Sequence, residues 1–397
     1  MQKIVIDKPY RFVPPLDARI WPKILGLYAP YFLNRHYGVV SVQCHGVEHL
    51  KASVDAGHGV LLTPNHCRDC DPFVLQPLAS AIGRPLFLMA SWHVFMQSRL
   101  QAFLLRRAGA FSIYREGMDR QAINAATEIL ESAKRPLLIF PEGVVSRTND
   151  RLNALMEGTA LIARAAAKRR AKSAPPGQVV VHAVAIRYHY AGNLQATLGP
   201  ALDEIESRLT WRPQHQPSLI ERIYKLGFTL LALKEIELLG EAQSGPIEQR
   251  LQNLIDHLLM PLEAKWLSGH REETTVGRVK RLRIAILPDL VKGDIPEAER
   301  QDRWRQLADV YLAQQLSHYP PDYIRSNPTP ERLLETVERF EEDMTDIPPV
   351  HRPLTASVNV GPAIPVTGAA DDLMVQIEEQ LKQLLGINQG ETAHVPA

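Results

Sequence analysis

The sequence predicts an α/β fold with a mostly parallel central sheet flanked by helices, and a large α-helical insertion or second domain beside it. Three observations support this prediction. Short apolar runs alternate with segments of helical spacing over residues 38–204. Long helical segments then dominate residues 205–350. A strand-like run and one further helical segment complete the chain over residues 351–397.

The strands of the first block are expected to be buried, because each is a short apolar run bounded by proline or glycine. The clearest runs are GVLLTP (59–64), PLFLMA (85–90), PLLIFP (136–141) and VVVHAVAIRY (179–188). Between them, residues 119–135 place Ile123, Ala126 and Leu130 on one face of a helix. Strands that alternate with helices pair in parallel, and ligands then bind at the carboxyl ends of the strands.

The second block contains longer helices and no apparent internal repeat. Its clearest helical segments are 218–242, 246–266 and 296–316. After it, TASVNVGPAIPV (355–366) alternates like a strand and precedes a helix at 371–385. We therefore expect residues 205–350 to be an insertion, after which residues 351–397 return to the first domain.

Charge is unevenly distributed along the chain. Residues 1–200 contain 24 Lys and Arg against 13 Asp and Glu, whereas the remaining residues contain 21 against 31. The first part is therefore expected to attract anions such as phosphorylated substrates or an anionic membrane surface. The basic run at 164–172 lies on a predicted helix and carries no nucleic-acid-binding signature, so no nucleic-acid partner is expected.

The composition indicates a cytoplasmic protein. Three cysteines are too few for a disulfide framework, and the opening residues lack a signal peptide. No apolar stretch reaches the roughly 18 to 20 residues that span a bilayer. Within residues 1–37, the segment 20–33 carries Trp21, Tyr28 and Tyr31, which suits either a helix at a membrane interface or one packed on the core. Any membrane attachment is thus expected to be peripheral, on the inner face.

The stretch LLTPNHCRDCDPF (61–73) has two chemical interpretations. Cys67 and Cys70 form a C-x-x-C, which occurs in zinc and redox sites. A structural zinc site needs four ligands, however, and only Cys44 and His45 are available to complete it. We therefore expect no metal, although a zinc or redox protein that uses Cys67 and Cys70 stays an alternative.

The same stretch places His66 five residues before Asp71. A turn after the preceding strand brings two such side chains to one side of the chain. The carboxylate would then orient the imidazole, which would act as a general base toward a hydroxyl of the substrate. This spacing alone is a weak signal, because it arises often by chance.

Two downstream motifs make the spacing of His66 and Asp71 more specific. GAFSIYR (109–115) ends in Arg115, and FPEGVVSR (140–147) places Glu142 and Gly143 on a turn after a strand. Together with NHCRDCD, and in this order, these motifs resemble the glycerolipid acyltransferase family, which includes the lysophosphatidic acid acyltransferases with an HX4D motif. The resemblance covers roughly residues 40–200, so residues 38–204 are the expected acyltransferase domain.

The resemblance implies transfer of a fatty acyl group from an acyl thioester to a lysophospholipid or glycerol-phosphate-type hydroxyl. The donor would be acyl-CoA or acyl-carrier protein, with no cofactor and no metal. His66 would be the general base and Asp71 its partner. The acceptor's phosphate site would contain Arg115, Glu142, Gly143, Ser146 and Arg147.

The sequence departs from the family pattern in its third motif. Val144 and Val145 follow Pro-Glu-Gly where the family usually has Thr and Arg, which leaves Ser146 and Arg147 to supply the donor and the charge. This departure, together with the helical block, motivates an alternative function: a non-catalytic lipid-binding relative with the same fold.

Overall fold

The computed structural model describes residues 8–18, 20–173, 176–209, 212, 217–320, 322–345, 347–367 and 372–387. The chain forms two compact units, and each is described by itself. Among the described residues, the sheet unit contains Tyr10–Ala191 and residues 350–387. The helical unit contains Gly192–Pro349.

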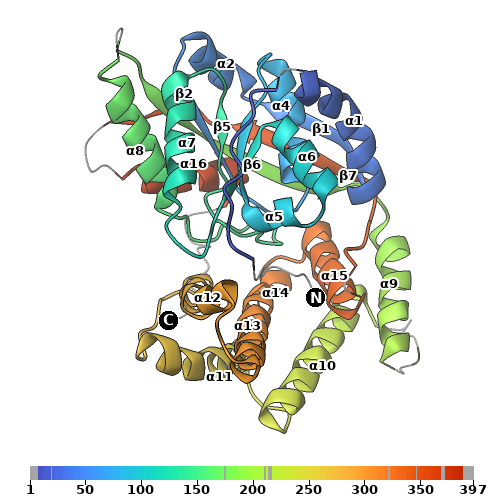
Figure 1. The fold of residues 1–397 in the computed structure, drawn as a ribbon. Helices are drawn as coiled ribbons and strands as arrows, with labels where there is room; N and C mark the ends of the chain where they lie inside the picture. Colours follow the sequence, from blue (N-terminus) through green and yellow to red (C-terminus); the bar gives the residue numbers. More distant parts are fainter. Residues whose placement is uncertain are drawn as a thin grey trace. The chain divides into compact units, whose positions relative to one another are not determined.

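One eight-stranded sheet organises the sheet unit (Figure 1). Its strands are β1 (Val39–His45), β2 (Gly59–Pro64), β3 (Phe87–Ser91), β4 (Ala110–Ile113), β5 (Leu137–Leu138), β6 (Val179–Tyr190), β7 (Leu354–Val360) and β8 (Ile364–Pro365). Their order is β1-β7-β6-β2-β5-β3-β4, with β8 paired to β6. Only the pairings of β6 with β7 and β8 are antiparallel among the described strands. The α/β fold with a mostly parallel sheet is thus confirmed.

The late strand β7 lies between β1 and β6, so the chain after the helical unit completes the sheet. The expected strand at 136–141 is much shorter than predicted, because β5 pairs only over Leu137–Leu138. The next residue still donates its backbone N–H to Leu62 O at 3.0 Å, but the chain then turns away. This early turn leaves the carboxyl end of β5 open for the loop described below.

Helices cover both faces of the sheet. They are α1 (Ile20–Tyr37), α2 (Val47–Asp55), α3 (Asp71–Val74), α4 (Gln76–Ala81), α5 (Trp92–Met96), α6 (Arg99–Ala108), α7 (Arg120–Ser132), α8 (Gly158–Arg170) and α16 (Leu373–Leu385). Apolar residues of α7, α8 and α16 form one core with Leu61, Val179 and Val181. On the opposite face, His182 of β6 contacts Ser53 of α2, since side chains alternate along a strand.

The helical unit contains α9 (Leu194–Arg208), α10 (Leu219–Leu239), α11 (Ile247–Leu267), α12 (Thr275–Lys292), α13 (Glu297–Ser317), α14 (Tyr323–Ser326) and α15 (Pro330–Thr345). Leucine-rich faces of α11, α12 and α13 form its core. Among the described residues of the whole chain, no helix is long and apolar enough to cross a membrane.

Buried ion pairs join successive helices of this unit. Arg222, Arg250 and Arg278 are each the fourth residue of a helix and follow one another at intervals of 28 residues. Each guanidinium binds a carboxylate near the end of the preceding helix: Glu206, Glu235 and Glu263, respectively. The leucines four residues after each arginine are fully buried. The expectation of no internal repeat is therefore wrong.

Candidate active site

His66 and Asp71 lie at the carboxyl end of β2, where the chain turns into α3. Asp71 is the first residue of α3, and Pro72 follows it in the first turn. Proline is tolerated there because the backbone N–H that it lacks would have no acceptor within the helix. His66 Nδ1 lies 2.8 Å from Asp71 Oδ2. A carboxylate only accepts hydrogen bonds, so this contact places the imidazole proton on Nδ1. Nε2 is then the basic nitrogen, and no described residue makes a hydrogen bond to it.

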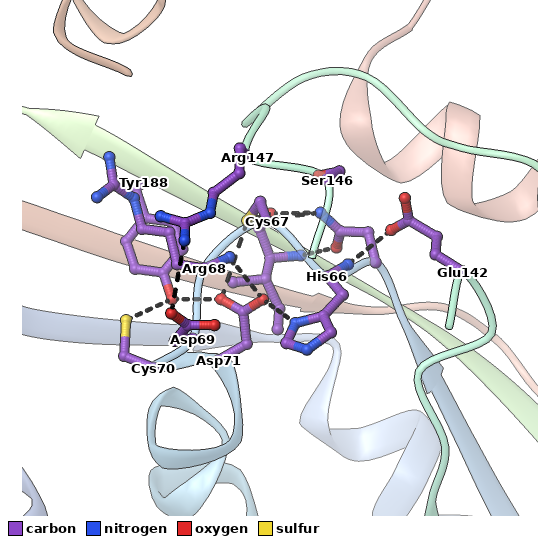
Figure 2. A network of polar contacts seen from close by, with 12 residues as sticks. His66, Cys67, Arg68, Asp69, Cys70, Asp71, Glu142, Ser146, Arg147 and Tyr188 are labelled. Carbon is purple, nitrogen blue, oxygen red and sulfur yellow. Dashed lines mark hydrogen bonds and ion pairs between the residues drawn. The ribbon is translucent and has the colours of Figure 1, made fainter. Parts of the chain in front are cut away.

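The carboxylate of Asp71 is fully buried and accepts three hydrogen bonds from N–H and O–H donors, besides a longer one of 3.9 Å from the thiol of Cys67. Oδ2 also accepts the backbone N–H of Arg68 at 3.0 Å, and Oδ1 accepts the hydroxyl of Tyr188 at 2.6 Å. Figure 2 shows this carboxylate between the imidazole of His66 and the phenol of Tyr188. The three donors offset the cost of removing the carboxylate from water. The orientation of His66 therefore depends on a group that is itself rigidly held.

Residues 140–147 hold the backbone and the ring of His66. The backbone N–H of His66 donates to Glu142 Oε1 at 2.7 Å, and its carbonyl accepts the N–H of Ser146 at 2.7 Å. The ring of Phe140 stacks on the imidazole, with centroids 3.9 Å apart. The first and third sequence motifs thus form one structural unit around His66 (Figure 2).

Glu142 is almost completely buried. Its second oxygen accepts the backbone N–H of Asn153 at 3.0 Å, so both oxygens are occupied by backbone donors. Burial raises the pKa of Glu142 to about 7, against the lowering effect of these two hydrogen bonds. The carboxyl group therefore binds backbone N–H groups, and its role is to hold the backbone of His66 in position.

Arg115 approaches the same turn from the end of β4. Its guanidinium Nη2 donates a hydrogen bond to the carbonyl of Gly143. Gly143 has φ = +69°, which strains any other residue, and a Cβ there would lie 2.3 Å from Met156 Sδ and would displace that side chain. The structure therefore brings the second motif onto the third, as the order of the motifs suggests.

Arg147 and Ser146 end this turn differently. Arg147 is partly exposed, has φ = +59°, and places Nη2 3.9 Å from Asp69 Oδ2. The hydroxyl of Ser146 is buried and donates to Thr148 O at 3.1 Å. The Arg147 side chain is thus partly exposed near Asp69, whereas the Ser146 side chain stabilises the loop.

Two residues at the site, Tyr188 and Asn149, carry no sequence signal, and Asn65, which begins the first motif, has a structural role that the motif does not reveal. The pairing of β2 with β6 ends at Val184. The backbone groups of Ile186 and Tyr188, further along the same edge of β6, therefore need other hydrogen-bond partners. The amide of Asn65 binds Ile186 N and O at 2.7 and 3.0 Å. The amide of Asn149 binds Tyr188 N and O at 2.6 and 2.7 Å. Two asparagines thereby extend the sheet and fix Tyr188 beside Asp71.

The two neighbouring cysteines, Cys67 and Cys70, are buried and form no disulfide. The thiol of Cys70 lies 3.2 Å from the hydroxyl of Tyr188, and burial raises its pKa to about 12. A buried thiol with a raised pKa is a poor nucleophile and a poor metal ligand. Among the described residues, no three His, Cys, Asp or Glu side chains are arranged to hold a metal ion.

Comparison with known protein families gives a match. Residues 41–187 match the model of a family described as Acyltransferase. The matched segment contains His66, Asp71, Arg115 and the Glu142 turn. A search of curated proteins found no match.

Proposed function

Because residues 41–187 match the model of a family described as Acyltransferase, we propose that this chain moves a fatty acyl group from an acyl thioester to a hydroxyl of a lysophospholipid or glycerol-phosphate-type acceptor. The acyl donor is acyl-CoA or acyl-carrier protein. The observation that carries the proposal is the imidazole of His66, which is fixed on three sides while Nε2 stays accessible to a substrate.

In the proposed reaction, Nε2 of His66 takes the proton of the acceptor hydroxyl as its oxygen attacks the thioester carbonyl. The resulting tetrahedral intermediate collapses and breaks the carbon–sulfur bond. The imidazolium returns its proton to the departing thiolate, so that an ester and a thiol are formed. Asp71 stabilises the imidazolium and keeps Nε2 in position.

The acceptor's phosphate is proposed to bind between Arg115 and Arg147. Both guanidiniums border the turn that holds His66, and a guanidinium matches the geometry of a phosphate. Gly143 has no side chain, so the backbone of the turn can approach the phosphate closely. Glu142 and Ser146 act through His66 and the loop, since the Glu142 carboxylate and the Ser146 hydroxyl are both buried.

The acceptor is a membrane lipid, so we also propose peripheral attachment to the inner face of the membrane. One face of α1 is buried at Pro22, Ala29 and Leu33. The opposite face exposes large apolar side chains: Ile20, Ile24, Leu27, Tyr28 and Tyr31. A helix with apolar side chains on two opposite faces needs a second apolar partner, which a lipid surface provides.

Helix α6 extends this surface. It contacts α1 through Trp21 and Phe103, whose ring centroids lie 5.6 Å apart, and it exposes Leu100 and Phe103. Neither helix contains Asp or Glu. Their cations are Lys23, Arg35, Arg99, Arg106 and Arg107. An apolar face bordered only by positive charge suits an anionic membrane. We call the exposed apolar side chains of α1 and α6 the apolar face.

The test is a matrix of acyl donors against lysolipid acceptors, read by mass spectrometry. Wild-type protein is expected to acylate lysophosphatidic acid or a related lysolipid, and His66→Ala is expected to lose this activity while staying folded. His270→Ala is the matched control, since this histidine is exposed on the helical unit. Full activity of His66→Ala contradicts the mechanism. Lysolipid binding without turnover in every combination supports the non-catalytic alternative instead.

A further inference from the structure

The segment Tyr10–Val13 runs along the outer edge of the sheet. We call it the N-terminal strap. β4 is the last strand in the sheet order, so its outer backbone groups have no strand beside them. The strap occupies this edge at Ser112: Val13 O accepts the N–H of Ser112 at 3.0 Å, and Val13 N–H donates to Ser112 Oγ at 2.8 Å. Phe12 packs against the core of the sheet unit, as Ile113 of β4 does.

Tyr10 ties the strap to the loop that follows β4. Its hydroxyl donates to Asp119 Oδ2 at 2.5 Å and lies 3.0 Å from Ser112 Oγ. Its ring stacks on Tyr114, with centroids 5.0 Å apart, and meets the edge of Trp92 at 5.4 Å. Burial and the neighbouring carboxylate raise the pKa of Tyr10 above its ordinary value, so the phenol stays a donor.

Asp119 connects both ends of this loop. Oδ2, which accepts from Tyr10, also accepts the backbone N–H of Tyr114 at 3.0 Å. Oδ1 caps helix α7 by accepting the N–H of Ala122 at 3.0 Å. Tyr114 immediately precedes Arg115, whose guanidinium binds the carbonyl of Gly143. A continuous set of contacts therefore leads from the strap to the turn that holds His66.

We infer that Tyr10 and Asp119 are positioning residues for Arg115, and that the N-terminal strap thereby sets the affinity for the anionic part of the acceptor. This inference rests on the proposed function, in which Arg115 binds phosphate. A guanidinium makes strong paired hydrogen bonds only in a defined orientation, so a loop free to shift weakens phosphate binding without touching the base.

The experiment compares Tyr10→Phe with wild-type protein on two acceptors: lysophosphatidic acid and monoacylglycerol, which lacks the phosphate. The KM for lysophosphatidic acid is expected to rise about fivefold, while kcat and the KM for monoacylglycerol stay unchanged. Tyr224→Phe is the matched control, because no described residue bonds to that hydroxyl. Added to Arg115→Ala, Tyr10→Phe is expected to have no further effect on KM.

Two results overturn the inference: an unchanged KM for lysophosphatidic acid, or an equal rise for both acceptors, which would indicate a general loss of structure. The same comparison is made with the Kd of lysophosphatidic acid, which needs no turnover. Wild-type protein that binds but transfers nothing contradicts the proposed function, whereas the Kd of Tyr10→Phe still decides the role of the strap.

Discussion

The carboxylate of Glu142 accepts the backbone N–H of His66 at 2.7 Å, although 76 residues separate the two in the sequence. A second backbone N–H, that of Asn153, occupies the other oxygen. The Pro-Glu-Gly turn is therefore built into the support of the proposed base. Its conformation and the position of the imidazole cannot change independently.

Glu142→Gln is expected to destabilise the protein and to lower kcat. The amide nitrogen of glutamine cannot accept, so one of two buried backbone donors loses its partner, at a cost of about 1–3 kcal/mol. Urea unfolding and initial rates measure both effects. Glu128→Gln on the exposed face of α7 is the control. Equal behaviour of the two variants would show that Glu142 does not support His66.

The raised pKa of Glu142 makes a prediction about pH. An acid whose folded-state pKa lies above its unfolded value is stabilising while protonated, and this stability is lost as pH rises from about 4.5 to about 7. The free energy of unfolding of wild type, relative to Glu142→Gln, should therefore fall by roughly 2–3 kcal/mol between pH 4.5 and pH 7.5. Urea titrations at several pH values measure it. A difference that is constant over this range would contradict the shift.

Replacing both Cys67 and Cys70 by alanine is expected to leave acyl transfer within about threefold of wild type, since the thiols lie behind the site, 3.9 Å from Asp71 Oδ1 and 3.2 Å from the hydroxyl of Tyr188, and neither forms a hydrogen bond with the imidazole of His66. The thiol of Cys70 should also resist iodoacetamide at pH 8, because its pKa is about 12. Mass spectrometry after timed alkylation measures this, with partly exposed Cys44 as the internal comparison. One zinc per chain, or loss of all activity, would revive the metal or redox alternative.

Leu27→Glu is expected to reduce binding to vesicles of phosphatidylglycerol and phosphatidylcholine by more than about tenfold. Leu27 is 85% exposed on the apolar face of α1, and the substitution replaces an inserted side chain by a charge that anionic lipid repels. Sedimentation with vesicles measures it at low salt. Leu233→Glu, on an exposed position of the helical unit, is the control. Equal binding by both variants would remove the apolar face from consideration.

Arg278→Met is expected to destabilise the helical unit by about 3–5 kcal/mol, because it leaves Glu263 buried without its partner. Arg281→Met, three residues away, removes a partly exposed pair with Glu272 and should cost less than about 1 kcal/mol. Thermal and urea unfolding distinguish the two. A small effect at Arg278 would mean that the buried pairs do not hold the helices together.

Local sequence features were sufficient for much of the fold. The strand expected at 59–64 is β2 with the same bounds, because glycine and proline mark both ends of a fully apolar run. The predicted strand at 136–141 was too long, since Ile139 keeps the apolar pattern after sheet pairing has ended. An apolar run indicates that residues are buried, and a buried loop is apolar as well as a buried strand.

The residues of the candidate site also differ in whether local sequence predicts them. His66 and Asp71 were recognisable because five residues and one turn connect them. Tyr188 and Asn149 were not, since their contacts with the site join segments far apart in the sequence. The repeat in the helical unit gives only a weak sequence pattern, because its copies share one arginine and a few leucines while their solvent-exposed positions differ.

The interval of 28 residues between Arg222, Arg250 and Arg278 also bears on how this chain can evolve. Excision of residues 250–277 would bring Arg278 to the place of Arg250, opposite Glu235. Both remaining arginines of this series would keep a buried carboxylate, whereas the exposed pair of Arg281 with Glu272 would be lost. A lineage can therefore gain or lose one whole helical module without leaving a buried charge of this series unpaired, and the modules are the natural units in which related chains should differ in length.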